Sequence, residues 1–177
     1  MPDDIILVDP QDRAIGVAPK RTVHLLGLRH RAFSILLSDD AGRVLLQRRA
    51  AEKYHSAGVW ANSCCGHPRP GESTNDAAVR RLYEELGVRV PLSHAGTFTY
   101  RAAVGKTMIE HEVDHVFLGT VVGEVAPDPR EVSALAWTSV DDLAADLTAH
   151  ASRYAAWLAN VLRVGLGERD RAATIAT

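Results

Sequence analysis

The sequence predicts a fold of the α/β (α+β) class, in which helices pack over a mixed sheet. Two observations support this. Apolar runs of strand length recur along the chain, and stretches with helical spacing lie between them. A length of 177 residues is enough for one well-buried core. We therefore expect a single domain over residues 1–177, with its core at about 5–165 and a frayed tail at 166–177.

Short apolar runs between turn residues predict the strands of the N-terminal third: Ile5–Val8, Ala14–Ala18, Ala32–Ser38, Arg43–Arg48 and Gly58–Ala61. The first two runs are close enough to pair as a hairpin. Residues 39–42 have turn chemistry between the next two. Between these pairs, the segment Lys20–Arg31 contains basic and histidine residues without a clear period, and we expect a loop there.

A helix is predicted after the loop at residues 68–71, and it runs to about Leu86. Ser73 or Thr74 is suited to cap its N-terminus, because an acid follows three residues after Ser73. Gly87 stands where a helix commonly ends in a left-handed conformation. The apolar residues of this helix follow helical spacing and form its buried stripe: Ala78, Val79, Leu82 and Leu86.

The C-terminal half alternates strands and helices. Its predicted strands are Val88–Val90, Ala95–Arg101, Ile109–Val121 and Val132–Thr138. A turn around Gly105 occupies residues 102–107. Ser139 is suited to cap a helix from Val140 to about His150, and a last helix is expected from about 152 to 164.

Composition and charge restrict the classes of function. A net charge of −2 gives no reason to expect nucleic acid or an anionic membrane as a partner. Two adjacent cysteines do not form a disulfide framework, so we expect a reducing, cytoplasmic setting. The acidic N-terminus is unlike a signal peptide, and no apolar run approaches the roughly 20 residues that span a bilayer. We expect a monomer.

The chain is organised around Asn62-Ser63-Cys64-Cys65-Gly66-His67-Pro68 and the basic and acidic helix that follows it. From Gly66 through Glu72 and Arg80 to Val88, the sequence resembles the Nudix box at nearly every defined position. Arg81 is the departure, because that box has a glutamate there. The run ending in Cys-Gly-His-Pro resembles type 1 isopentenyl-diphosphate isomerase. The resemblance covers about residues 5–165 and implies the Nudix fold, an α/β/α sandwich with a mixed sheet.

Cys65 has two interpretations. Without context, a cysteine pair in an apolar stretch is most often core filler. Within the isomerase motif, however, Cys65 matches the catalytic thiol, and Cys64 occupies a variable position that we interpret as core. We expect Cys65 to act as a thiolate base, which requires a nearby cation or His67 to lower its pKa.

Glu110 and Glu112 are two residues apart on a predicted strand and therefore share one face. An isolated pair of this kind is as often a solvated edge as a site. The resemblance implies that both are metal ligands and that Glu112 is also the catalytic carboxylate, on the proton-donor side. It further implies metal ligation by His24, His30 and His67. This mixed nitrogen and oxygen set suits Mn²⁺ or Zn²⁺, and Mg²⁺ less naturally.

Binding of a diphosphate requires several cations and usually a bridging Mg²⁺. Singly, a basic residue is most often only a surface residue. The resemblance implies diphosphate binding by Lys20, Arg49, Lys53 and Arg81, and a role for Glu85 in binding the Mg²⁺ that accompanies the substrate. An arginine in place of the box glutamate at position 81 removes a metal ligand and adds a phosphate ligand. The site would then hold a diphosphate rather than cleave it.

Tyr100 and Trp157 would be core aromatics without the family context. The resemblance implies that Tyr100 hydrogen-bonds the catalytic carboxylate and that Trp157 faces the branched carbon of the substrate. The expected function is interconversion of isopentenyl and dimethylallyl diphosphate through a tertiary carbocation, in isoprenoid biosynthesis. The alternatives are a Nudix pyrophosphohydrolase, which Arg81 disfavours, and a catalytically silent binding module.

Overall fold

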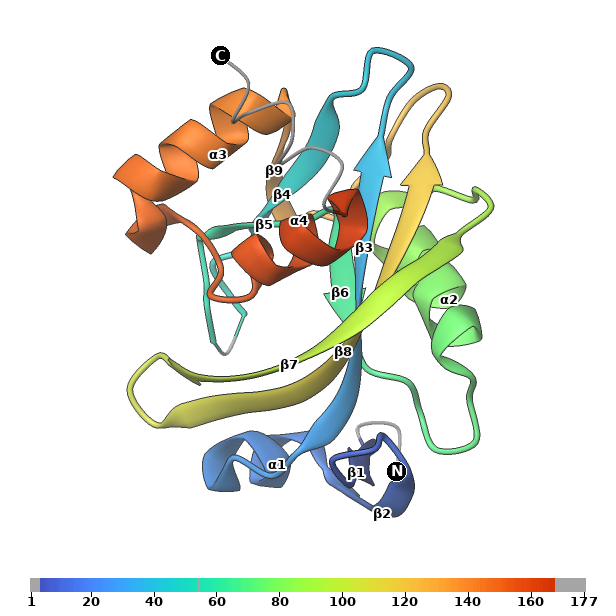
Figure 1. Ribbon diagram of the computed structural model, residues 1–177, viewed down its shortest axis with the longest axis vertical. Coiled ribbons are helices and arrows are strands. Elements are labelled where there is room, and N and C mark those ends of the chain that lie inside the picture. Colours follow the sequence, from blue (N-terminus) through green and yellow to red (C-terminus); the bar gives the residue numbers. More distant parts are fainter. Residues whose placement is uncertain (1–3, 54, 168–177) are drawn as a thin grey trace.

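The computed structural model describes residues 4–53 and 55–167. Of the tail predicted at 166–177, Leu166 belongs to the last helix, and residues 168–177 lie outside the described range. Within it, nine strands form one sheet with helices on both faces (Figure 1). Helix α2 (Thr74–Leu86) covers one face, and α3 (Val140–Ala149) and α4 (Leu158–Leu166) cover the other. The predicted mixed sheet and α/β/α layering are confirmed.

The strands of the sheet have the following bounds: β1 Asp4–Val8, β2 Ala14–Pro19, β3 His30–Ser38, β4 Val44–Arg49, β5 Trp60–Ala61, β6 Cys64–Gly66, β7 Ser93–Val104, β8 Met108–Thr120 and β9 Val132–Thr138. The long β3 is the centre. It runs parallel to β8 and antiparallel to β6. Strands β7 and β8 form a long antiparallel hairpin that curves across the lower part of Figure 1.

Alternation along β3 explains why helices cover both faces of the sheet. Ile35 packs in the cluster under α2, whereas its neighbour Leu36 packs in the cluster under α3 and α4. Phe117 and Val116 of β8 divide in the same way. Successive side chains of a strand point to opposite faces, so an unbroken apolar strand must be buried on both sides.

The caps predicted for α2 and α3 are confirmed. Ser73 accepts a hydrogen bond from the Asp76 backbone N–H at 3.1 Å, and Ser139 does the same for Asp142. Gly87 ends α2 in the left-handed region, with a φ of 67°. The capping rules apply here because both helix ends are exposed and rely on local partners.

The prediction of a loop at Lys20–Arg31 was wrong for its first part, because Lys20–Leu26 forms helix α1 and ends at the left-handed Gly27. The helix is only seven residues long, and its inward-facing residues include the polar His24 as well as Val23. A helix that presents polar groups to a polar site has no apolar stripe, and therefore no period to detect.

Two further predictions were wrong. Val88–Val90 is not a strand, although Val88 is buried under α2. The nearby backbone hydrogen bond is made instead by the Ala126 N–H, which donates to the Leu86 carbonyl. The last helix begins at Leu158 rather than at about 152, after a 3₁₀ turn at Ala151–Arg153. Tyr154 bridges to Trp60 of β5 between them, which interrupts the helical pattern.

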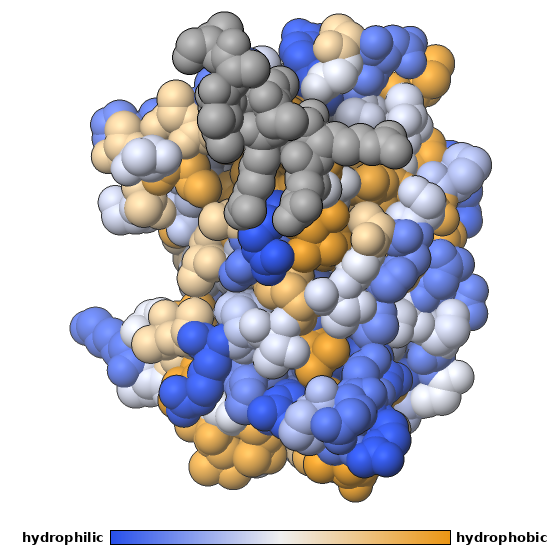
Figure 2. All heavy atoms as spheres, viewed as in Figure 1, coloured by the Kyte–Doolittle hydropathy of each residue, from blue (hydrophilic) through white to orange (hydrophobic). Residues whose placement is uncertain are grey.

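Figure 2 shows apolar residues at the lower edge of the molecule, where Figure 1 places α1 and β2. The exposed apolar residues of these elements are Ile15, Val17, Leu25 and Leu26. No helix of the described residues is long and apolar enough to cross a membrane.

Candidate active site

A cavity of about 380 Å³ lies where β3, β6 and β8 meet α2. Its walls include every residue predicted to act in catalysis or diphosphate binding: Cys65, Tyr100, Glu112, Trp157, Lys20, Arg49, Lys53 and Arg81. Three predicted metal ligands, His67, Glu85 and Glu110, also line it. The remaining two, His24 and His30, are fully buried and lie 5.5 and 5.0 Å from the His67 ring, centroid to centroid.

Strand register explains how distant residues meet at Glu112. The parallel pairing of β3 with β8 sets His30 opposite Glu112, and the antiparallel pairing of β7 with β8 sets Tyr100 opposite the same residue. The Tyr100 hydroxyl lies 2.7 Å from Glu112 Oε2. The three strands therefore supply a histidine, a carboxylate and a phenol side by side.

We call the group His24, His30, His67, Glu110 and Glu112 the histidine end of the cavity. Ligand atoms of His24, His30, His67 and Glu112 all lie within 4.8 Å of one another. The Nδ1 atoms of His24 and His30 lie 2.7 and 2.8 Å from the carbonyls of Lys20 and Leu28. A carbonyl only accepts, so Nδ1 carries the proton and Nε2 the lone pair in each neutral ring.

This arrangement fits a divalent cation. Glu112 Oε1 lies 3.2 Å from His30 Nε2 and 3.0 Å from His67 Nε2. When His30 is neutral, its Nε2 and the Glu112 Oε1 that faces it are both acceptors, so a proton or a cation must lie between these two atoms. Adjacent ligands of an octahedral ion with bonds of about 2.1 Å are about 3 Å apart, close to the observed separations. A cation there would hold Glu112 ionised and neutralise buried charge.

The two glutamates of β8 differ in protonation. Burial would raise the pKa of Glu112, but its contacts with the His30 and His67 imidazoles, which favour the carboxylate when a proton or a cation lies between them, outweigh burial and hold that pKa well below the ordinary value. Burial and the charge of Glu112 raise the pKa of Glu110 to about 8. Tyr100 also lies 2.8 Å from Glu110 Oε2. Because Tyr100 has one hydroxyl proton, it donates to one of the two carboxylates at a time.

Cys64 and Cys65 point to opposite sides of β6. Cys64 is fully buried in the core under α2, as predicted, whereas Cys65 lines the cavity. The expectation of a thiolate at Cys65 is not met in this structure. Burial raises the pKa of Cys65 to about 12 and outweighs the opposing effect of Arg49, whose Nη1 lies 3.8 Å from the sulfur. Cys65 is therefore a neutral thiol here.

Trp157 lies at the start of α4 with its ring buried against the cavity. Its Nε1 donates to Asn62 Oδ1 at 2.9 Å, which fixes the orientation of the ring. Asn62 in turn donates to the carbonyls of Ile35 and Cys64. The indole is thus anchored to the same segment that carries Cys65.

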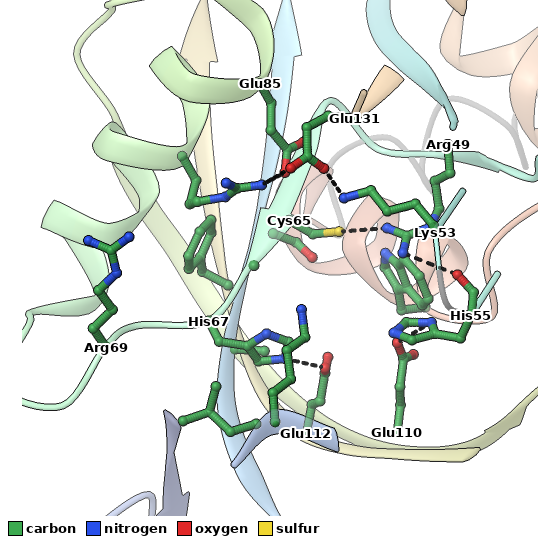
Figure 3. Close-up of a pocket in the computed structure, with 18 of the residues that line it drawn as sticks. Arg49, Lys53, His55, Cys65, His67, Arg69, Glu85, Glu110, Glu112 and Glu131 are labelled. Atoms are coloured by element: carbon green, nitrogen blue, oxygen red, sulfur yellow. Dashed lines mark hydrogen bonds and ion pairs between the residues drawn. The ribbon is translucent and has the colours of Figure 1, made fainter. Parts of the chain in front are cut away.

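We call Lys53, Arg81, Glu85 and Glu131 the basic end of the cavity. Figure 3 shows Glu85 and Glu131 on one side of Cys65, and His67, Glu110 and Glu112 on the other. Arg81 forms ion pairs with Glu85 and, at 3.2 Å, with Glu131, and Lys53 also pairs with Glu131. Gln47 donates to Glu85 at 3.1 Å. The guanidinium predicted to hold diphosphate is therefore already bound by carboxylates of the chain.

Sequence reasoning missed several residues of this site. His55 is buried next to His24 and Glu110, and Glu131 joins Lys53 to Arg81. Asp114 lies fully buried on β8, two residues after Glu112, and accepts from Ser34 Oγ at 2.8 Å. The continued alternation Glu110, Glu112, Asp114 was a signal for the last of these. His55 and Glu131 lie in irregular segments, where no period indicates which side chains turn inward.

Comparisons with known proteins show the family to which the chain belongs. The profile described as NUDIX domain matches residues 28–161. An isopentenyl-diphosphate Delta-isomerase of Serratia proteamaculans is 46% identical over 177 residues, which is 99% of each chain. One from Nocardia farcinica is 51% identical over 89% of this chain and 91% of its own.

Solved structures with a similar fold are more distant in sequence. The crystal structure of DR0079 from Deinococcus radiodurans has a TM-score of 0.75 and 18% identity, and the match covers 91% of this chain and 98% of that one. A MutT protein from Methanosarcina mazei has a TM-score of 0.58 at 24% identity, over 66% of this chain and 81% of that one. At these identities the likeness concerns the fold alone.

Proposed function

This chain belongs to the NUDIX superfamily and, within it, to the isopentenyl-diphosphate Delta-isomerases, and on that premise we propose that it interconverts isopentenyl and dimethylallyl diphosphate. The observation that carries the proposal is one cavity lined by a thiol, a carboxylate, an indole and several basic groups. An isomerase of this kind needs a proton donor and acceptor, an apolar wall that faces a cation, and a place to hold the diphosphate.

Protonation states support Cys65 as donor and Glu112 as acceptor in the direction that forms dimethylallyl diphosphate. The Cys65 thiol holds its proton, and Glu112 is ionised. The thiol proton adds to the terminal methylene, and the alkene electrons form the new C–H bond. Glu112 then removes a proton from the methylene on the other side of the tertiary carbocation, and those C–H electrons form the new double bond. The reverse reaction exchanges the two roles. The sequence suggested Glu112 as donor and Cys65 as base but left open which of the two donates, because the reaction runs both ways; we propose the opposite order for the forward direction.

The intermediate must be shielded from water. Trp157 presents an anchored ring to the cavity, and an aromatic face near positive charge contributes up to about 2 kcal/mol when desolvated. The Tyr100 ring lies 6.5 Å from it, centroid to centroid, and the Tyr100 hydroxyl hydrogen-bonds Glu112. We propose that Tyr100 orients the Glu112 carboxylate and so holds the oxygen that accepts the proton in a fixed position.

Lys20, Arg49, Lys53 and Arg81 are proposed to hold the diphosphate, together with a substrate-borne Mg²⁺ on Glu85. The family implies dependence on a divalent metal, and the histidine end supplies a donor set for it. We propose Mn²⁺ or Zn²⁺ rather than Mg²⁺ there, because imidazole suits the borderline ions. When bound, such a cation supplies positive charge that stabilises the Glu112 carboxylate.

We further propose that the whole chain, residues 1–177, is one domain that acts as a monomer in the cytoplasm, without nucleic acid or membrane as a partner. The net charge of −2 supports the part of this proposal that concerns nucleic acid and membranes, and the two free cysteines support the part that concerns the compartment. Its place is in isoprenoid biosynthesis, because both diphosphates are five-carbon isoprenoid units.

The direct test is incubation with isopentenyl diphosphate and Mg²⁺ in deuterated water. We expect deuterium in the methyl group of dimethylallyl diphosphate, because the added proton exchanges with solvent. Release of phosphate or pyrophosphate without deuterium incorporation would contradict the proposal and revive the pyrophosphohydrolase alternative. Arg81 argues against that alternative, because it puts a positive charge where the Nudix box has a carboxylate.

A further inference from the structure

Arg69 lies at the opening of the cavity. It comes from the loop between β6 and α2 and lines the cavity wall, yet it is an exposed residue, as is Glu52. The structure forms no ion pair between these two described residues. The other Lys and Arg residues of the described wall are buried or half-buried: Lys20, Arg49, Lys53, Arg80 and Arg81. An exposed wall residue meets an incoming ligand before the deeper groups do.

The guanidinium of Arg69 has no hydrogen-bond or ion-pair partner within the described part of the chain. The carboxylate of Glu72 is close in sequence but already occupied. Its oxygens accept from the Arg80 guanidinium at 2.7 and 2.8 Å, and Oε2 also accepts from the Arg69 backbone N–H at 2.9 Å. The hydrogen bonds from Arg80 lower the pKa of Glu72 most, and the more distant charge of Arg69 lowers it least. Figure 3 shows Arg69 apart from the carboxylates of the basic end.

The backbone of Arg69 is held in place although its side chain is not. Pro68 and Pro70 flank it, and each proline ring fixes its own φ. Pro70 also disfavours a helical conformation of Arg69. The Glu72 N–H donates to the Arg69 carbonyl at 2.9 Å and closes the turn. A ligand that binds the guanidinium therefore orders one side chain but no loop.

The cations deeper in the cavity are less suited to make the first contact with a diphosphate. At the basic end, Lys53 and Arg81 are each paired with a carboxylate, and Arg80 is paired with Glu72. A carboxylate in contact with a cation offsets its field, so an unpaired guanidinium attracts an anion over a longer distance. The fork of N–H donors in a guanidinium also matches phosphate oxygens.

We propose that Arg69 forms an entry subsite for the diphosphate. Its guanidinium contacts the anionic head at the cavity opening, before that head takes the place of carboxylates at the basic end. This inference rests on the proposed function, because it concerns how the same substrate reaches the same cavity. It makes Arg69 a substrate-binding residue whose main effect is on the rate of association.

The test is stopped-flow binding of inorganic pyrophosphate with Mg²⁺ to the full chain, followed by tryptophan fluorescence, since Trp157 lines the cavity. At low ionic strength, Arg69→Gln should lower the association rate constant by about threefold or more, and change the dissociation rate constant by less than about twofold. The difference in association should disappear as salt is raised towards about 1 M, because salt screens an exposed charge.

Arg163→Gln is the matched control. Arg163 is an exposed arginine of α4 outside the cavity wall, and it too has no ion pair within the described part of the chain. Its loss changes the net charge of the chain by the same amount, and we expect less than about a twofold change in the association rate constant. Arg69→Lys retains the charge without the planar fork, so it should keep about half or more of that rate constant.

Three results would overturn the inference and leave the isomerase proposal standing. One is equal association rate constants for Arg69→Gln and Arg163→Gln. Another is an effect of Arg69→Gln that lies in dissociation and does not depend on salt. The third is an Arg69→Lys variant as slow as Arg69→Gln. The deuterium experiment tests the isomerase reaction separately, because pyrophosphate binding needs no turnover. Thermal unfolding of each variant should give an unchanged Tm, which separates loss of binding from loss of fold.

Discussion

The histidine end and the basic end of the cavity balance their charges in different ways. At the histidine end, carboxylates on β8 face buried imidazoles whose pKa values are low for His24 and His67 because burial disfavours their charged forms. At the basic end, Lys53 and Arg81 are paired with Glu131 and Glu85. A bound cation would therefore neutralise carboxylate charge at the histidine end, whereas at the basic end the charges of Lys53 and Arg81 are already neutralised by carboxylates.

This difference indicates how each ligand binds. A cation at the histidine end adds a missing charge to groups that are already positioned. A diphosphate at the basic end must instead displace carboxylates from the guanidinium and ammonium groups, so its binding is an exchange of partners. Cys65 lies between the two ends, which is where a substrate held by its diphosphate would place its alkene (Figure 3).

The largest expected effect tests whether proton transfer takes place at Cys65, between the histidine end and the basic end of the cavity. Cys65→Ser should lower turnover of isopentenyl diphosphate by about 10²-fold or more, because it replaces a proton-transfer group. Cys64→Ser is the matched control, since that side chain is in the core and its loss should affect stability instead. If the two variants have equal turnover, or if Cys64→Ser is the slower, the assignment of Cys65 is wrong.

The next prediction removes a ligand at the histidine end. His67→Asn or Glu110→Gln should lower the divalent metal that remains after dialysis, with affinity reduced by about tenfold or more. Elemental analysis measures it. His94→Asn is the control, because His94 is an exposed histidine that contacts His115 rather than the cavity. Full metal content in both test variants would remove this end as the metal site.

At the basic end, Arg81→Glu should weaken binding of isopentenyl diphosphate. A charge-assisted contact contributes about 1.5–3 kcal/mol, which is roughly ten- to a hundredfold in affinity, and reversal of its sign should cost at least that. Although the change restores the Nudix-box glutamate, we expect little phosphate release from nucleoside diphosphates. Unchanged affinity would exclude Arg81 as a diphosphate ligand.

A smaller effect is expected at Glu131, which tests whether diphosphate displaces carboxylates from Lys53 and Arg81 when it binds. Glu131→Gln removes a carboxylate that competes with diphosphate for Lys53 and Arg81. We expect inorganic pyrophosphate to bind about two- to fivefold more tightly, in line with the modest strength of partly exposed ion pairs. Calorimetric titration measures it, with the exposed Glu124→Gln as control. Weaker binding would mean that Glu131 instead positions the two cations.

The smallest expected effect concerns pH. Burial lowers the pKa of His24 from 6.5 to about 4, so the unfolded chain takes up its proton first as the pH falls. The contribution of neutral His24 to stability is present above pH 6.5 and is lost as the pH falls towards 4. In the metal-free protein, His24→Gln should reduce the fall in Tm over that range. An unchanged pH profile would contradict the low pKa.

Local sequence rules were sufficient to predict those elements whose structure depends on residues nearby in the sequence. The caps Ser73 and Ser139, the stop at Gly87 and the buried strand β8 could be predicted from the sequence, because capping and alternation act over a few residues. The division between a core Cys64 and a cavity-lining Cys65 was also predicted. The assembly of the site residues in one cavity was implied by the family motifs, and their individual roles stay predictions.

Tertiary structure decided the rest. Helix α1 exists because Val23 and His24 are buried against the sheet, although seven residues form no stable helix in isolation. His55 and Glu131 turn into the cavity from irregular segments. The protonation of Cys65 and Glu112 depends on burial and on partners from other strands, which no local pattern encodes. The sequence determined which groups are present, and packing determined which of them carry charge.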